Sequence, residues 1–172
     1  MDQRLRFIPL QTSKADDYNL LMECAKATNL EMDVQLMRRL RIMPFAGMYV
    51  LEENNNVLCC VLCLKVRQLA SIYVPAARRH QGHATTMLHK LVDLYRPLIE
   101  KWSCGFWCPV SPDVGELFIK AGWIAVTTNV ASDGSVDHSP LWCKDLFMND
   151  PSDYEALIAD TIRLNLGLIK SS

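Results

Sequence analysis

The clearest periodic pattern in the chain begins at Ala84. Apolar residues recur there at intervals of three and four positions, which is the spacing of an amphipathic helix. They are Ala84, Met87, Leu88, Leu91, Val92 and Tyr95. The opposite face is polar, with His89, Lys90 and Asp93. The pattern predicts a helix over Ala84–Tyr95 that packs one face against a core and ends before Pro97.

An apolar run, Leu69–Val74, precedes this helix and is typical of a strand. The connecting loop is basic, with Arg78 and Arg79, and contains Gly82. The first amides of a helix lack partners within the helix, and the helix dipole adds positive charge there. Gly82 allows the backbone to approach a ligand because it has no Cβ. The loop therefore predicts a binding site for a phosphate or a diphosphate.

The rest of the chain alternates between strand and helix patterns. Six further strands are predicted: Leu5–Leu10, Met48–Glu52, Val57–Val66, Gly105–Val110, Trp123–Asn129 and Leu141–Phe147. The second and third of these form a hairpin whose turn is Asn54–Asn56. Four further helices are predicted: one capped by Ser13, one over Asp33–Ile42, one capped by Ser111 and ending at Gly122, and one within Asp153–Lys170. The order is β-α-α-β-β-β-α-β-α-β-β followed by an extra helix. It predicts an α/β protein with a mixed sheet and helices on both faces.

Length and charge narrow the class of protein. A chain of 172 residues, half of them apolar and 22% charged, is expected to form one folded domain with a real core. The net charge of −1 disfavours electrostatic coating of nucleic acid. No apolar run is long enough to span a membrane, and Met1–Arg6 does not begin a signal peptide. A cytoplasmic location is therefore expected.

The seven cysteines do not form a metal-binding pattern. In a strand, Cys59 and Cys63 point to one face and Cys60 to the other, which is poor geometry for a shared ion. Cys104-x-x-x-Cys108 is at best a loose match to the spacing of zinc ligands. We expect no metal site, and we interpret these cysteines as small buried apolar residues in a reducing compartment.

The loop also carries a family resemblance. Arg79-x-x-Gly82-x-Ala84 resembles the Gln/Arg-x-x-Gly-x-Gly/Ala signature of the GNAT N-acetyltransferases. The resemblance implies that the loop cradles the diphosphate of acetyl-CoA, the co-substrate, and that backbone groups at Val74 bind its pantetheine arm. His80 and His83 are then anion contacts or spacers. The expected binding residues are Val74, Arg79, His80, Gln81, Gly82, His83, Ala84, Thr85 and Phe118.

A second stretch, Ser111–Trp123, resembles the family segment Asn-x-x-Ala-x-x-Leu-Tyr-x-x-x-Gly-Phe. Leu117 and Gly122 match it, Trp123 keeps an aromatic ring, and Ser111, Val114 and Phe118 replace Asn, Ala and Tyr. The resemblance covers the predicted elements up to about Phe147. It implies a GNAT-like domain over residues 1–148, with residues 149–172 as a helical extension that packs on the same domain or on a partner.

Two catalytic groups of the family are missing. The family Tyr protonates the departing thiolate, which the ring of Phe118 cannot do. A thiolate is a tolerable leaving group, because a thiol has an ordinary pKa of roughly 8.5. Ser111, Tyr73 or water are candidates for the donor. The strand Leu69–Val74 contains no carboxylate base, so the candidates for the base are Tyr73 through water, or Asp137 and His138.

The sequence thus predicts an N-acetyltransferase that moves an acetyl group from acetyl-CoA directly to an amine of a small molecule or a protein. One alternative is a GNAT-fold binding or structural protein that has lost catalysis. Another is a GNAT-like enzyme that modifies nucleic acid, to which the near-neutral charge gives little support. The acceptor and the oligomeric state stay open, and the C-terminal helix is a candidate surface for a second copy or for a protein partner.

Overall fold

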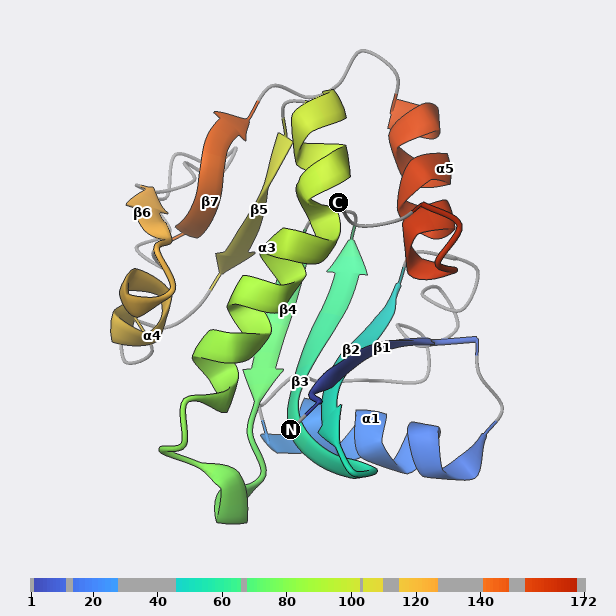
Figure 1. Cartoon of the computed structure of the whole chain (residues 1–172), viewed down its shortest axis with the longest axis vertical. Helices are drawn as coiled ribbons and strands as arrows, with labels where there is room; N and C mark the ends of the chain where they lie inside the picture. The colour runs from blue at the N-terminus through green and yellow to red at the C-terminus, as the bar shows by residue number, and fades with distance from the viewer. Residues whose placement is uncertain are drawn as a thin grey trace, which may run out of the picture.

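The computed structural model describes residues 2–11, 14–27, 46–65, 68–102, 104–109, 115–126, 141–148 and 154–169. Their elements, in chain order, are β1 (Arg4–Pro9), α1 (Ala15–Ala27), β2 (Gly47–Glu53), β3 (Asn56–Lys65), β4 (Gln68–Tyr73), the 3-10 helix η1 (Ala76–Arg78), α3 (His83–Trp102), β5 (Cys104–Pro109), α4 (Gly115–Lys120), β6 (Ile124–Val126), β7 (Leu141–Met148) and α5 (Tyr154–Asn165). The strands form one sheet in the order β1-β2-β3-β4-β5-β7-β6. Neighbours are antiparallel except β4 and β5, which are parallel. The described elements therefore form the predicted mixed sheet (Figure 1).

The sheet separates two apolar cores. On β2, Tyr49 faces the core beneath α3 and α5, while Met48 faces the core shared with α1. The same alternation holds on β3: Cys59 and Cys63 lie in the first core and Cys60 in the second. The predicted division of these three cysteines between the two faces is confirmed. Cys24, Cys59, Cys60 and Cys63 are buried, and none of these four forms a disulfide.

Helix α3 buries the apolar positions that the sequence pattern picks out: Met87, Leu88, Leu91, Val92 and Tyr95. The prediction that this helix ends before Pro97 is wrong, because α3 continues through Pro97 to Trp102. Proline removes one hydrogen bond, to the carbonyl of Asp93, which lies on the exposed face. Buried Leu98 holds the following turn against the core, so the helix continues.

Helix α5 packs against α3 within the same chain. Its Leu157 and Leu164 are buried, and Leu164 belongs to the core beneath α3. The buried carboxylate of Asp160 accepts hydrogen bonds from Lys101 Nζ at 2.6 Å and Trp102 Nε1 at 3.1 Å. Helix α5 therefore covers the β1–β3 side of α3 through apolar and ionic contacts.

Several predictions fall outside the described residues, namely the helix over Asp33–Ile42, the caps Ser13 and Ser111, and the late-loop residues Asp137 and His138. The remaining strand predictions agree with the structure to within one or two residues where it is described. The predicted turn holds Asn54 and Asn55 at φ 52° and 63°, the left-handed angles that Asn tolerates. Among the described helices, none is both long and apolar enough to cross a membrane.

Candidate functional site

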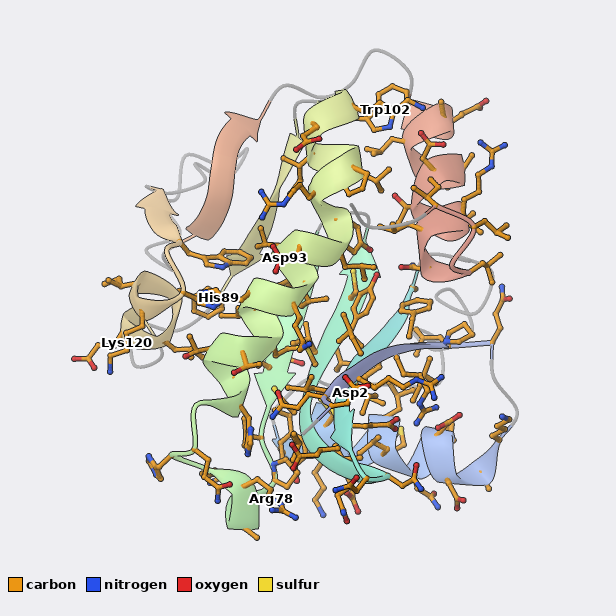
Figure 2. All side chains as sticks on the ribbon, viewed as in Figure 1. Asp2, Arg78, His89, Asp93, Trp102 and Lys120 are labelled. Atoms are coloured by element: carbon orange, nitrogen blue, oxygen red, sulfur yellow. The ribbon has the colours of Figure 1, made fainter. Side chains whose placement is uncertain are left out.

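A cleft of about 730 Å³ opens where β4 ends and α3 begins, with α4 along one side. Figure 2 shows Arg78, the last residue of η1, and Lys120 on α4, both of which contribute to this cleft. Its described lining is Ala27, Ile72, Tyr73, Val74, Arg78, Arg79, His80, Gly82, His83, Ala84, Thr85, Glu116, Leu117 and Lys120. The cleft therefore contains most of the residues that the sequence assigns to a binding site.

Two left-handed residues shape the loop between β4 and α3. His80 has φ 61° and Gly82 has φ 79°. A Cβ built on Gly82 meets no atom within 4 Å, so glycine is favoured here by the backbone angle and not by crowding. Left-handed residues among ordinary ones turn successive amides toward one side, which makes a concave site for an anion.

The amides of this loop are open. Thr86 N donates to Gly82 O at 3.0 Å and is the first amide of the helical ladder. Within the described part of the chain, the backbone amides from His80 to Thr85 donate to no protein acceptor. They stand at the N-terminus of a 20-residue helix, where the dipole adds positive charge. The loop thus offers several N–H donors to one anion.

Three side chains brace the loop from within. Arg79 Nε donates to Val74 O at 3.2 Å, which leaves the terminal nitrogens of the guanidinium for a ligand. Gln81 Nε2 donates to Ala77 O at 3.3 Å. The Nε2 atom of His83 lies 3.1 Å from Gln81 Oε1. Gln81 therefore supports the loop, and it is absent from the described lining of the cleft.

The cleft carries more positive charge than the chain as a whole. Its described lining includes the cations Arg78, Arg79 and Lys120 and the single carboxylate of Glu116, whereas the complete chain has a net charge of −1. Lys120 Nζ lies 3.6 Å from Glu116 Oε2, one helical turn away. Such a concentration of cations attracts anionic ligands and raises their local concentration.

Strand β4 extends beyond the carboxyl end of its parallel neighbour β5. The first residue of β4, Gln68, is in register with Trp107 near the carboxyl end of β5. On its other side β4 pairs with β3 as far as Tyr73. Among the described residues, the peptide groups after Gln68 that face away from β3 therefore have no partner strand. They lead toward Tyr73 and Val74 at the cleft.

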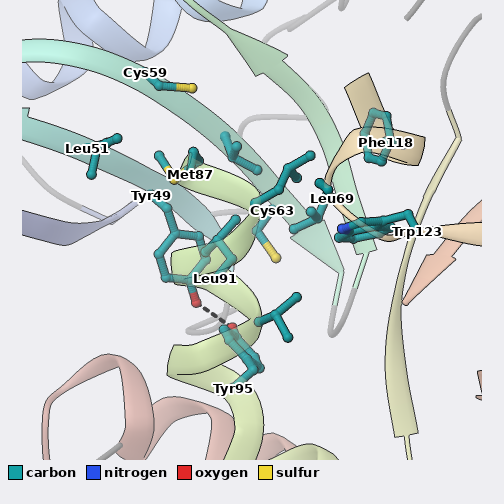
Figure 3. Packing of buried hydrophobic residues seen from close by; sticks show 14 of the residues in the cluster. Tyr49, Leu51, Cys59, Cys63, Leu69, Met87, Leu91, Tyr95, Phe118 and Trp123 are labelled. Atoms are coloured by element: carbon teal, nitrogen blue, oxygen red, sulfur yellow. Dashed lines mark hydrogen bonds between the residues drawn. The ribbon is translucent and has the colours of Figure 1, made fainter. Parts of the chain in front are cut away.

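Phe118, which the resemblance assigns to the cofactor, lies in the core. Its side chain is fully buried and packs edge-on against Trp123, with ring centroids 5.2 Å apart (Figure 3). The neighbouring residue Leu117 faces the cleft instead. Ser111, the other candidate on this segment, lies outside the described residues.

Sequence reasoning missed Glu116, Lys120, Ala27 and Ile72 as cleft residues, and it treated Arg78 only as a source of charge. Residues four apart on a helix share a face, so the spacing of Glu116 and Lys120 could have paired them. It could not have shown that this face borders the loop before α3, because that contact joins distant segments.

Metal-ligating groups and cysteine thiols in the described structure do not form a second site. No three His, Cys, Asp or Glu side chains among the described residues are placed to hold a metal ion. Burial raises the pKa of Cys24 to about 11 and that of Cys63 to about 12. These thiols therefore stay protonated near neutral pH and are poor nucleophiles.

Comparison with known proteins yields similarity in structure but not in sequence. No family model and no curated protein matches the chain. The structure resembles the spermidine N-acetyltransferase of Vibrio cholerae solved with CoA and spermine, at 13% identity and a TM-score of 0.56, over 82% of this chain and 92% of that one. It also resembles aminoglycoside acetyltransferase AAC(6')-Ib solved with coenzyme A and kanamycin, at 14% identity and a TM-score of 0.59, over 84% and 95%.

A Bacillus subtilis acetyltransferase solved with CoA is similar over 84% of this chain and 99% of that chain, at 11% identity and a TM-score of 0.58. At sequence identities this low, the similarity shows a shared fold and does not show a shared activity or substrate. The mixed sheet agrees with the order of elements that the sequence predicts. This chain therefore has the fold of the GNAT acetyltransferases.

Proposed function

We propose that this chain transfers an acetyl group from acetyl-CoA to an amine. The observation that carries the proposal is the row of amides from His80 to Thr85, which donate to no protein acceptor in the described structure and lie at the N-terminus of α3 beside a basic cleft. The GNAT fold supports it, because similar structures of acetyltransferases contain CoA.

The donor would extend along the cleft in two parts. Its diphosphate would bind the amides of the loop and the terminal nitrogens of Arg79. Its pantetheine arm, which contains amide groups, would run along the free peptide groups of β4 toward Tyr73. The arm would thus occupy the place of a partner strand.

The chemistry needs no covalent enzyme intermediate. A neutral amine attacks the thioester carbon, the C–S bond breaks, and the CoA thiolate leaves and takes up a proton, while the nitrogen loses one. The protein contributes proximity and N–H groups that stabilise the oxyanion. Tyr73 is our candidate for the proton donor, with Ser111 as the second candidate, and Glu116 adds a carboxylate that could accept the proton from the amine.

The acceptor is proposed only as a class. The similar structures include enzymes named for spermidine and for aminoglycosides, both of which carry several amines. Small polyamines and amino sugars are therefore the first compounds to test, and peptides and protein N-termini the second.

The test combines binding and turnover. We expect isothermal titration of the full chain to show acetyl-CoA binding that is lost in Arg79→Glu and Gly82→Trp, because the first reverses a ligand charge and the second fills the open space beside the amides. Arg96→Glu is the matched control, since Arg96 pairs with Asp93 on the exposed face of α3. A screen for acetyl-CoA consumption over the amines should reveal turnover with the same dependence. A folded sample that gives no binding at millimolar acetyl-CoA would refute the proposal.

One observation favours a second candidate, a GNAT-fold protein that binds CoA without catalysis. Phe118 is an apolar core residue where the resemblance places a Tyr proton donor. Binding of CoA without acetylation of any amine would support this candidate. Turnover that disappears in Arg79→Glu would exclude it.

A further inference from the structure

The face of α5 that points away from the core is apolar. The buried face of this helix consists of Leu157, Asp160, Thr161 and Leu164. A helix turns by about 100° per residue, so the opposite face carries Glu155, Ala159, Ile162 and Leu166. Leu166 follows the last residue of α5, but its amide donates to Ile162 O at 3.0 Å, which keeps it on the helix.

This arrangement is unusual for a helix at the edge of a fold. Figure 1 shows α5 at the edge of the described structure, beside α3. A surface helix normally places polar residues on its outward face. Here Ala159 and Ile162 are half-buried, while Leu166 is 68% exposed and Leu168, just beyond it, is 72% exposed. Neighbouring exposed apolar side chains of this size are typical of a surface that contacts another protein.

The charges beside this face indicate which protein fits. Glu155, in the first turn of α5, is exposed and forms no ion pair within the described part of the chain. Arg163, in the last turn, is 62% exposed, and one of its nitrogens contacts Asp160 at 3.3 Å. Opposite charges at opposite ends of a helix are complementary to the same helix running in the opposite direction. An antiparallel second copy therefore matches, whereas a parallel copy would place like charges side by side.

We propose that two copies of this chain form a dimer in which their α5 helices pack antiparallel through the apolar outward faces. Around the two-fold axis, Ile162 of each copy packs against Ala159 of the other, whose small side chain allows the helices to approach closely. Glu155 then lies within about one helical turn of Arg163 of the second copy. Helices this short bury less than the roughly 1,600 Å² of a standard interface, so we expect a Kd on the order of 10 μM.

The dimer leaves both clefts open. Helix α5 contacts α3 near its end, at Lys101 and Trp102, whereas the cleft lies at the start of α3. The 20 residues of α3 span about 30 Å between these points. Dimer formation and acetyl-CoA binding are therefore separate properties, and this inference does not rest on the proposed function.

The experiment is sedimentation velocity of the full chain at concentrations that span the expected Kd, about 1–200 μM. We expect the fraction of dimer to rise over this range. Leu166→Lys should weaken the dimer about tenfold or more, because it places a charge in the contact on both copies. Glu155→Lys should weaken it about threefold to tenfold, because it turns an attraction to Arg163 into a repulsion.

Ile119→Lys is the matched control for Leu166→Lys. Ile119 is 61% exposed on α4, at the opposite edge of the fold from α5 (Figure 1), so this variant should dimerise like the unmodified chain. All three substituted side chains are exposed, and thermal unfolding followed by circular dichroism should show that each variant stays folded.

Three results would overturn the proposal. The first is a monomer at every concentration. The second is a dimer that Leu166→Lys does not weaken, or weakens no more than Ile119→Lys does, because the contact would then lie elsewhere. The third is a dimer that Glu155→Lys leaves unchanged, because the helices would then not pack antiparallel.

Discussion

Gly82 and Gly167 adopt nearly the same left-handed angle, with φ 79° and 72°, and a Cβ built on either meets no atom within 4 Å. They differ in place. Gly82 borders the cleft, whereas Gly167 ends α5, where its amide donates to Leu164 O and the next amide to Arg163 O. This is the pattern that commonly closes a helix on a glycine. A substitution at either glycine should therefore reduce stability through the backbone angle, but only a substitution at Gly82 should also affect ligand binding.

We predict that Gly82→Ala and Gly167→Ala each lower the free energy of unfolding by about 1 kcal/mol, because alanine tolerates this angle poorly. Only Gly82→Ala should also weaken acetyl-CoA binding, since its methyl group enters the space in front of the open amides. Chemical denaturation and isothermal titration of both variants provide the measurements. Equal acetyl-CoA affinity in the two variants would argue against a ligand at this loop.

At the scale of elements, the contact between α3 and α5 depends on Asp160. Its carboxylate accepts hydrogen bonds from Lys101, Trp102 and Arg163, the last at 3.3 Å. The bond from Lys101 contributes most to holding the pKa of Asp160 below its ordinary value of 3.8. A lowered pKa means that the folded state favours the ionised form. The resulting stabilisation is complete above that ordinary value and is lost as pH falls below it.

We predict that Asp160→Asn lowers the free energy of unfolding at pH 7 by about 1–3 kcal/mol, because the three donors lose a charged acceptor. The variant should also lose less stability than the unmodified chain between pH 5 and pH 3. Denaturant titrations at the three pH values measure both effects. Asp93→Asn is the control, since Asp93 is 67% exposed in its pair with Arg96 and should contribute at most about 0.5 kcal/mol. The same pH response in both variants would contradict this role of Asp160.

At the scale of the whole molecule, the C-terminal helix completes the core. Asn165 on α5 accepts a hydrogen bond from the Tyr49 hydroxyl at 2.5 Å, and the hydroxyls of Tyr49 and Tyr95 are themselves hydrogen-bonded (Figure 3). This buried network joins β2, α3 and α5. Leu157 and Leu164 are buried beside it. Residues 154–169 thus pack on the rest of the chain as part of the same structure.

We predict that a chain ending at Met148 does not fold cooperatively. It would lose two buried leucines and the hydrogen-bond acceptor of Tyr49, a loss on the order of 5 kcal/mol or more. Typical domains have a total stability of only about 5–15 kcal/mol. Thermal unfolding followed by circular dichroism tests this, with the full chain as reference. A sharp transition at an unchanged temperature would show that residues 1–148 form an independent domain.

The site shows where prediction from sequence succeeds and where it stops. The loop from Arg79 to Ala84 could be found because strand, loop and helix are neighbours along the chain. Glu116 and Lys120 could not, because they reach the cleft only after α4 packs beside the start of α3. Phe118 matches a family motif by position, yet its burial against Trp123 depends on how that turn packs on the sheet.

The sequence by itself determined the elements and the nature of the loop. Helical and strand periodicity, glycines at left-handed turns and the amides at a helix start all follow from backbone geometry within a few residues. The tertiary structure decided which of these local tendencies prevailed. Helix α3 passes Pro97 because Leu98 is buried and because Lys101 and Trp102 bind Asp160, 58 or more positions later. The order of the strands, the charge of the cleft and the place of α5 likewise depend on contacts between distant segments, and no local pattern encodes them.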